Sequence, residues 1–468
     1  MLFNSLAYAV FLPVALAGYF LLPERWRNLW LLAASCFFYM VYQPAYILVL
    51  ATLIAIDYFA GLAIGKAPAG RLRRAYLMAS IGATCLALFA FKYYGFISGN
   101  MALLSRALGI PFAPGHGGWP LPIGLSFHTF QSLAYVIEVY GGRQSAERDP
   151  VVYATYVMFF PQLVAGPIER PGNMLHQFRE RHTFDAERVE AGLRRIVWGL
   201  FKKCVIADRL ALLVNDVYAD PGVVGGVHLT AAAVAFSYQI YCDFSGYSDI
   251  AVGSAQLLGF RLTENFATPF CAASLSEFWR RWHISLTTWF RDYVFIPLGG
   301  SRGTRRQTAR NLLFTFALSG LWHGADWTFV LWGLVNGAAV VAGRLTGKNL
   351  LGRLGGVPMT FAFVTASFVL FRAASLSEAL YFYMHFFRDW SWKWPETGRF
   401  DLLQWQIAIP AIALLEAAQW FERHPAASAR FQALFSPGLR RAAYLSFALS
   451  IPIFGIYFGR GTFVYFQF

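Results

Sequence analysis

Two histidines of this 468-residue chain each follow a tryptophan directly, and histidine is the side chain best suited to proton transfer near neutral pH. His323 lies in "LSGLWHGADW" (318–327), a run with no charged residue before Asp326. An imidazole buried there would lose its hydration, stay neutral near pH 7 and accept a proton as a general base. The alternative is a histidine that only packs in a core. Ser319 and Asp326 favour the first interpretation, because both share the helical face of His323 if the helix continues.

His283, in "SEFWRRWHISL" (276–286), has a more polar setting. An interfacial amphipathic helix with an aromatic belt would explain the tryptophans of this stretch, but not a histidine between them. With helical spacing, Trp279 and Arg280 lie on the same face as His283, four and three residues before it. Such a face could hold a phosphate-bearing cofactor while the imidazole approaches the chemistry.

Charges within apolar runs form a second group of candidates. Residues 187–210 carry several cations, among them Lys202 and Lys203. They are too charged to cross lipid alone, so the segment lies at the interface or lines a pocket. Further on, "SYQIYCDFSGYSDI" places Asp243 and Asp249 between apolar flanks. A carboxylate at that depth is costly and is a functional candidate, although both could instead fix the helices around a pocket.

A third histidine, His128, lies in the charge-poor run "PIGLSFHTFQSL". It is a candidate for lining a channel, and packing is the alternative. The chain contains no HExxH set, no GxSxG elbow and no Walker loop, so we expect neither a metal nor a covalent nucleophile. Chemistry would then depend on positioned histidines and a bound, activated donor.

The elements that must position these residues are membrane-spanning helices. Hydrophobic residues make up 57% of the chain and charged residues 14%, whereas soluble domains carry about 25% charge. Uncharged runs such as 1–23, 28–56 and 107–137 are long enough for spans of roughly 20 residues. We expect an all-α polytopic membrane protein with about eleven spans and with re-entrant and interfacial helices, forming a single integral-membrane domain over residues 1–468. The Pro- and Gly-rich stretch 158–171 should be irregular, which is tolerated at membrane depth only inside protein or beside a cavity.

The formal charge of +14 reflects membrane topology rather than nucleic-acid binding. Two basic loops, at residues 66–74 and 302–310, contain no acidic residue. Short loops enriched in Lys and Arg mark the cytoplasmic side. Alternating spans then place the N-terminus outside, and the lipid bilayer is the expected partner of most of the surface.

Several motifs together make the chain recognisable. "EFWRRWHISLTTWFRDYVFIPLGGSR" (277–302), followed by "LSGLWHGADWTFVLWG" (318–333), resembles the membrane-bound O-acyltransferase (MBOAT) family, and in particular its bacterial alginate O-acetyltransferase-like branch. Further matching stretches are "MLFNS", "LPIGLSFHTFQSLAYVIEVY", "FPQLVAGPIER", "YCDFSGYSDIAVG", "NFATPF" and the terminal "FVYFQF". The resemblance extends over nearly the whole chain.

The resemblance implies an MBOAT fold, with spans around a central funnel where a cytoplasmic donor and an external acceptor meet. It implies that His323 is the catalytic histidine of the family and that His283 assists it. It also implies acetyl-CoA as the donor substrate, with no permanently bound cofactor. The expected partners are a periplasmic esterase-like acetyltransferase and a polysaccharide export or modification complex at the bacterial inner membrane. Alginate is the first candidate polymer, with peptidoglycan and cellulose as alternatives.

These expectations give each candidate residue a role. His323 would deprotonate the acceptor hydroxyl, whereas His283, or the neighbouring Trp282, would polarise the thioester carbonyl or orient the acceptor. Trp322 is a further candidate pocket residue beside His323. Four cations are candidates to meet the nucleotide phosphates, with snorkelling at the membrane surface as the alternative for each: Arg280, Arg281, Lys202 and Lys203.

Two other functions compete with acyl transfer. A transporter or flippase of a lipid-linked or small solute would use buried His and Asp side chains as a proton relay, but the sequence has no inverted-repeat pattern. A scaffold that anchors an export complex would tolerate replacement of both histidines.

Overall fold

The structure is a computed structural model that describes residues 1–112, 119–345, 355–388, 390 and 402–457. Throughout these ranges the regular structure is helical and no β-strand occurs, which confirms the all-α prediction. The terminal "FVYFQF" lies outside the described residues.

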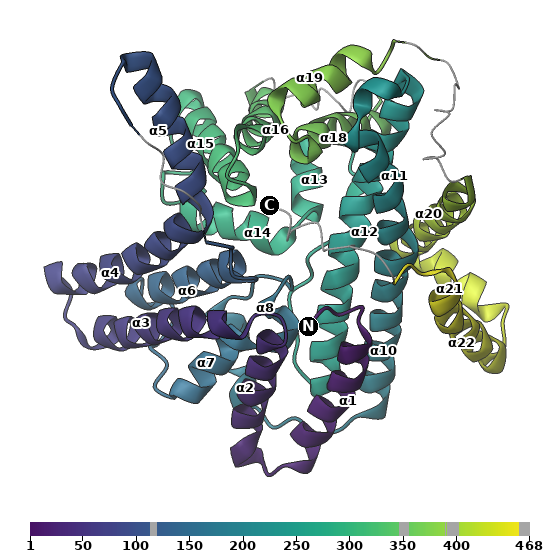
Figure 1. The fold of residues 1–468 in the computed structure, drawn as a ribbon. Coiled ribbons are helices and arrows are strands. Elements are labelled where there is room, and N and C mark those ends of the chain that lie inside the picture. Colours follow the sequence, from purple (N-terminus) through teal and green to yellow (C-terminus); the bar gives the residue numbers. More distant parts are fainter. Residues whose placement is uncertain (113–118, 346–354, 389, 391–401, 458–468) are drawn as a thin grey trace. The chain divides into compact units, whose positions relative to one another are not determined.

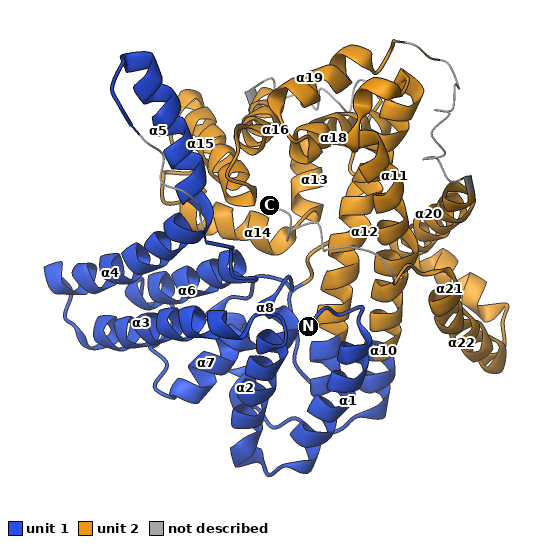
Figure 2. Ribbon diagram, viewed as in Figure 1, with its two compact units in different colours: residues 1–192, 254–263 blue, residues 193–253, 264–468 orange. Residues whose placement is uncertain are grey.

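The chain divides into two compact units (Figure 2). Unit 1 comprises residues 1–192 and 254–263, and unit 2 comprises residues 193–253 and 264–468. Helices α10 (Ala186–Leu200) and α12 (Gly226–Leu258) each have residues in both units. The expectation of a single integral-membrane domain stays a prediction.

Unit 1 is built mainly from the first nine α-helices (Figure 1). Helix α3 packs against α4 and α6, α4 also packs against α6, and α2 packs against α7. The elements are α1 (Leu6–Leu21), α2 (Glu24–Met40), η1 (Pro44–Tyr46), α3 (Ile47–Lys66), α4 (Arg71–Leu88), η2 (Phe89–Tyr93), α5 (Tyr94–Leu108), α6 (Leu125–Tyr140), α7 (Pro150–Met158), α8 (Phe160–Leu163), α9 (Pro171–Met174) and η3 (Gln177–Arg179).

Two helical stretches of unit 1 are long and apolar enough to cross a membrane. They are Pro44–Lys66 and Arg71–Leu108, and they were found among the described residues only. Leu6–Leu21 and Val357–Arg372 are apolar but shorter. The number of about eleven spans and the central funnel therefore stay predictions.

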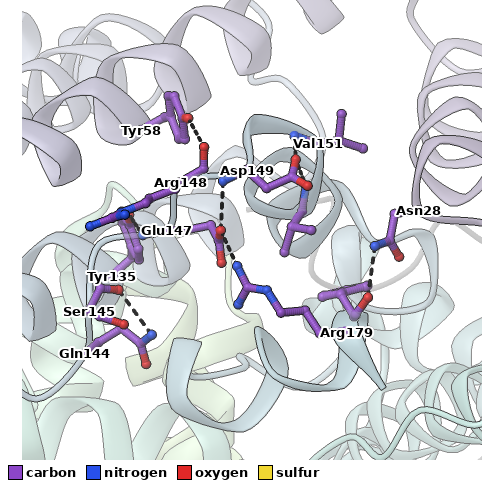
Figure 3. A network of polar contacts seen from close by, with 12 residues as sticks. Asn28, Tyr58, Tyr135, Gln144, Ser145, Glu147, Arg148, Asp149, Val151 and Arg179 are labelled. Atoms are coloured by element: carbon purple, nitrogen blue, oxygen red, sulfur yellow. Dashed lines mark hydrogen bonds and ion pairs between the residues drawn. The ribbon is translucent and has the colours of Figure 1, made fainter. Parts of the chain in front are cut away.

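A buried carboxylate fixes the loop between α6 and α7 (Figure 3). The Glu147 side chain is 3% exposed, and its Oε1 accepts hydrogen bonds from the Asp149 backbone N–H at 2.8 Å and from Arg179 Nη2 at 2.5 Å. The hydroxyl of Tyr135 accepts from the Glu147 backbone N–H at 3.0 Å. Asp149 in turn caps α7 by accepting from Val151 N–H at 2.8 Å. The charge thus orders the loop that leads into α7.

The predicted irregular stretch 158–171 is confirmed. Helix α7 ends at Met158, the short α8 follows, and no regular helix occurs again before α9. The stretch is almost entirely buried by protein. Glu169 holds it in place, because its carboxylate accepts hydrogen bonds from the Thr263 backbone and hydroxyl and from Asn173 Nδ2.

Unit 2 holds the candidate site residues other than His128. Its most extensive helix pair is α15 with α16, and α16 also packs against α18 (Figure 1). Besides its parts of α10 and α12, it contains η4 (Phe201–Ala207), α11 (Asp208–Ala219), η5 (Pro221–Val223), η6 (Pro269–Cys271), α13 (Leu275–Arg281), α14 (Ile284–Phe290), η7 (Arg291–Phe295), α15 (Arg305–His323), α16 (Trp327–Leu345), α18 (Val357–Arg372), α19 (Leu376–His385), α20 (Leu402–Arg423), α21 (Pro425–Ala433) and α22 (Pro437–Phe454).

Two glycines allow α15 and α16 to approach closely. A Cβ atom on Gly320 of α15 would overlap the carbonyl oxygen of Phe329, and one on Gly333 of α16 would overlap that of Phe316. Any larger residue at either position would push the two helices apart. This contact fixes the end of α15, where His323 lies.

Candidate active site

Unit 2 contains a cavity of about 470 Å³ bordered by α13, α14, η7, α15 and α16. Both tryptophan-preceded histidines line this cavity. Its further lining residues include Trp279, Arg280, Trp282, Arg291, Ser319 and Arg344. The cavity therefore gathers imidazoles, indoles and guanidinium groups from α13, η7, α15, α16 and the junction between α13 and α14.

His283 lies at the junction between two short helices. Helix α13 is capped by the preceding Ser274, whose hydroxyl accepts from the Glu277 backbone N–H at 3.2 Å. It ends at Arg281, and α14 begins at Ile284. His283 itself has a φ of 44°, in the left-handed region, and is 1% exposed.

The prediction that Trp279, Arg280 and His283 share one face of a continuous helix is therefore wrong. The helix stops before His283, so the spacing of four and three residues does not operate across the junction. All three side chains nevertheless line the cavity. The bend between α13 and α14 brings them together instead of a continuous helix.

His323 is the last residue of α15 and is 5% exposed. Gly324 follows in an extended conformation and ends the helix. Asp326 consequently does not share the helical face of His323, and its carboxylate accepts from the Thr328 backbone N–H at 2.8 Å at the start of α16. Ser319 lies on α15 one turn before His323 and lines the same cavity. Of the two residues expected on the helical face of His323, only Ser319 lies in the same helix.

Aromatic rings surround the imidazole of His323. The ring centroids of Trp322, Trp332 and Phe371 lie 4.8, 5.2 and 5.3 Å from that of His323. Trp322 is 6% exposed and packs against the histidine without being among the cavity-lining residues. The surroundings are apolar, as the sequence indicated.

The two imidazoles lie near each other across the cavity. Their ring centroids are 6.4 Å apart and the ring planes meet at 57°. Ring nitrogens lie close to their own centroid, so at this separation the two rings do not hydrogen-bond each other directly. A bound functional group could contact both.

Trp282 and Trp279 differ in their surroundings. Trp282 is 2% exposed and packs between Phe278 and Phe368, at centroid distances of 5.4 and 5.3 Å. Trp279 lies beside Trp332 at 5.7 Å, and its buried indole nitrogen has no hydrogen-bond partner among the described residues. Both border the cavity, so Trp279 joins Trp282 as a candidate hydrogen-bond donor. The sequence alone indicates Trp282 for that role.

Of the predicted phosphate-binding cations, only Arg280 lines the cavity. Arg281 instead donates to Glu277 Oε1 at 2.6 Å and to the Thr268 hydroxyl at 3.1 Å. Arg291 and Arg344, which no sequence motif marks as phosphate-binding, also line the cavity. Their basic character alone gave no signal, because the chain has 39 Lys and Arg residues.

Lys202 and Lys203 belong to a buried ion-pair network and not to the cavity lining. Both lie in the π-helical turn η4 and are at most 4% exposed. Lys203 Nζ lies 2.7 Å from both Asp208 and Asp243, and Lys202 Nζ lies 2.5 Å from Asp249. Their expected role with phosphates stays a prediction, and the geometry supports a different role.

Asp243 and Asp249 hold helices together through these pairs. Asp243 links α12 to η4, and Asp249 on α12 pairs with Lys202 and, at 3.0 Å, with Arg195 of α10. The idea that these carboxylates fix helices rather than react is consistent with this geometry.

His128 lies in α6 of unit 1 and is 1% exposed. Its Nδ1 lies 3.0 Å from the Ser132 hydroxyl. It is not among the lining residues of the cavity in unit 2. A channel-lining role for His128 stays a prediction.

The sequence of this chain has relatives among known proteins. The sequence model of MBOAT, the membrane-bound O-acyltransferase family, matches residues 143–350. Relatives at up to 39% identity extend the similarity over 89% of the chain. The chain belongs to the membrane-bound O-acyltransferase family, and it is an O-acyltransferase.

Three relatives with named activities are similar to this chain. The chain is 39% identical to the probable alginate O-acetylase AlgI of Pseudomonas aeruginosa, over 89% of this chain and 81% of AlgI. It is 33% identical to the peptidoglycan O-acetyltransferase of Helicobacter pylori, over 81% of this chain and 78% of that protein. The teichoic acid D-alanyltransferase of Bacillus subtilis is 28% identical over 45% of this chain and 56% of its own length.

Proposed function

We propose that this O-acyltransferase takes an acetyl group from cytoplasmic acetyl-CoA and passes it across the inner membrane for O-acetylation of an exported polysaccharide. Alginate is the first candidate polymer, because the similarity to AlgI extends over most of both chains. Peptidoglycan is the second, from the similarity to the Helicobacter pylori enzyme. Cellulose has no support among the relatives described above. A periplasmic esterase-like acetyltransferase within an export complex would collect the acyl group.

One observation carries the proposal: the rings of His283 and His323 border the same cavity, 6.4 Å apart. A thioester donor and a hydroxyl acceptor need no metal or covalent nucleophile if a base aligns them. The acceptor hydroxyl gives its proton to the imidazole of His323 while its oxygen bonds to the thioester carbonyl carbon. The carbon–sulfur bond then breaks, and the leaving thiolate takes the proton from the imidazolium.

The cations of the cavity fit the donor end of this reaction. Arg280, Arg291 and Arg344 line the cavity and are candidates to meet phosphates. Arg291 also pairs with Asp292 at 2.7 Å, and Arg344 donates to the Ser301 hydroxyl at 3.0 Å. Trp279 and Trp282 line the same cavity, and the indole N–H of either could polarise the thioester carbonyl. The donor would enter from the cytoplasm, with the basic loops on that side and the N-terminus outside.

The ion pairs weaken the transporter alternative. A proton relay needs carboxylates that can change protonation. Asp243 and Asp249 instead pair with buried lysines, at 2.7 and 2.5 Å, and hold helices together. Acyl transfer is therefore the function that the cavity supports best.

The test replaces His323 with alanine and compares it with His176→Ala. His176 is an exposed histidine whose side chain pairs with Glu180 at the surface, so its loss controls for a removed imidazole. Each variant would be expressed in Pseudomonas aeruginosa that lacks AlgI, and the acetyl ester content of the secreted alginate measured. We expect wild-type and His176→Ala chains to restore acetylation and His323→Ala to fail at equal membrane abundance. Restored acetylation by His323→Ala would refute the catalytic assignment.

If no variant restores alginate acetylation, membrane vesicles and radiolabelled acetyl-CoA separate a wrong polymer from a wrong reaction. Wild-type vesicles that release CoA and acetylate a resident acceptor, with His323→Ala inactive, would keep acyl transfer and exclude alginate. Solute flux that depends on a proton gradient and needs no acetyl-CoA would favour the transporter.

A further inference from the structure

The side-chain amide of Asn265 contacts the imidazole of His283, although Asn265 does not belong to either histidine motif. Asn265 is 2% exposed and begins the stretch "NFATPF". Its Oδ1 lies 3.1 Å from Nδ1 of His283 and accepts from the Ser285 hydroxyl at 2.9 Å and from the Ser285 backbone N–H at 3.3 Å. Its Nδ2 donates to the Ser248 hydroxyl at 3.3 Å.

These contacts determine which way the amide points. A backbone N–H can only donate, so the Asn265 atom that faces Ser285 N–H must be the oxygen. An amide oxygen can only accept. The His283 nitrogen that faces the same oxygen, Nδ1, must therefore carry a proton.

The structure assigns Asn265 as the positioning residue that fixes the tautomer of His283, with the proton on Nδ1 and the lone pair on Nε2. Asn265 is not among the residues that line the cavity, whereas His283 is. The Nδ1–H thus faces the protein, in a residue that also lines the cavity.

The backbone around Asn265 supports the same role. The carbonyl oxygen of Asn265 accepts from the Ile284 N–H at 2.9 Å, and the N–H of Ala267 donates to the Arg281 carbonyl at 3.0 Å. Segment 265–268 therefore runs alongside the junction that carries His283. It holds His283 in the left-handed backbone region, with a φ of 44°, that a non-glycine residue rarely adopts without such support.

This tautomer gives His283 a different role from His323. The inference about roles rests on the proposed function. A neutral imidazole with its proton on Nδ1 accepts a hydrogen bond at Nε2 and cannot donate one there. His283 therefore orients the acceptor hydroxyl toward its attack and does not polarise the thioester carbonyl. An N–H for the carbonyl has to come from another residue, and Trp279 and Trp282 both line the cavity.

The test is ¹⁵N magic-angle-spinning NMR on the full chain in lipid bilayers, with ¹⁵N-labelled histidine. Subtracting the spectrum of His283→Gln identifies the His283 signals among the nine histidines. In the wild type we expect a protonated Nδ1 and an unprotonated Nε2. Asn265→Leu removes the acceptor and should shift the ring toward the Nε2–H tautomer. A wild-type spectrum with the proton on Nε2, or a tautomer that Asn265→Leu leaves unchanged, would overturn the assignment.

Asn336→Leu is the matched control. Asn336 is also a buried asparagine of unit 2, 1% exposed, and its Nδ2 donates to the Trp332 carbonyl at 2.9 Å. The same amide is lost there without contact to His283, so its spectrum should keep the wild-type His283 tautomer. If Asn265→Leu does not insert into membranes, the wild-type spectrum alone decides between the two tautomers.

Kinetics provide the second readout. Asn265→Leu should lower kcat for acetyl transfer at least about tenfold with KM for acetyl-CoA within about twofold, because the donor contacts remain. Asn265→Asp keeps an oxygen acceptor for Nδ1–H and should restore most of the lost kcat. Equal loss in both variants would indicate a merely structural residue. The NMR result does not depend on acetyl transfer, so it stands or falls separately from the proposed function.

Discussion

The imidazoles of His283 and His323 lie 6.4 Å apart across one cavity, although His283 lies between two short helices and His323 ends a long one. If both rings act in the same chemical step, replacing either one should lower kcat about as much as replacing both. We expect His283→Gln, His323→Gln and the double variant to have similar residual kcat values, measured with radiolabelled acetyl-CoA in vesicles. Strictly multiplicative losses would contradict a shared reaction step.

Trp279 tests the origin of carbonyl polarisation. Trp279→Phe keeps an aromatic ring against Trp332 but removes the buried indole N–H. Loss of one donor to a developing oxyanion costs on the order of a hundredfold in kcat, and we expect a fall of about tenfold or more in the same assay. Trp282→Phe should mainly lower thermal stability, because Trp282 is packed between phenylalanines. If Trp282→Phe lowers kcat and Trp279→Phe mainly lowers thermal stability, Trp282 is the hydrogen-bond donor instead.

Arg291 and Arg344 test the donor end of the cavity. Both line it, and a guanidinium–phosphate contact contributes to binding of donor and transition state alike. Each Arg→Gln variant should raise KM for acetyl-CoA about tenfold with little change in kcat. Arg430→Gln, on the exposed surface of α21, should leave KM unchanged. An unaltered KM in both cavity variants would place the nucleotide elsewhere.

Lys203 tests the buried ion pairs. Replacing it with methionine leaves Asp208 and Asp243 buried without their shared cation. Breaking a buried pair in this way costs about 3–5 kcal/mol, so we expect a strongly lowered midpoint of thermal unfolding in detergent. Lys66→Met, at the exposed end of α3, should unfold like the wild type. A stable Lys203→Met protein that no longer binds acetyl-CoA would instead support the phosphate-binding role.

Gly333 tests the close contact of α15 and α16. Gly333→Val would drive its side chain into the Phe316 carbonyl and displace the end of α15 that carries His323. We expect loss of both thermal stability and acetyl transfer. In the same helix, a Cβ on Gly343 meets no atom within 4 Å, so Gly343→Ala should preserve both. Normal activity of Gly333→Val would mean that the helices separate without consequence for the site.

Much of the helical architecture and the identity of the two histidines follow from the sequence because they depend on local properties. Hydrophobicity along the chain predicts helices, and the irregular backbone at 158–171 follows from its proline and glycine residues. A histidine in an uncharged run is likewise visible from the local sequence alone. The prediction that Trp279 and Arg280 share a helical face with His283 was wrong, because it required the helix to continue beyond Arg281.

Only the tertiary structure decided how these residues meet. The bend at His283 is maintained by hydrogen bonds from the 265–268 segment, and sequence spacing carries no information about such a distant contact. The same holds for Lys203, whose partner Asp243 comes from another helix, and for Asn265, whose amide is a common polar group until its neighbours are known. Local sequence determines which side chains can do chemistry and which segments become helices. Packing between distant segments determines where each helix ends, which charges neutralise each other and which nitrogen of an imidazole carries the proton.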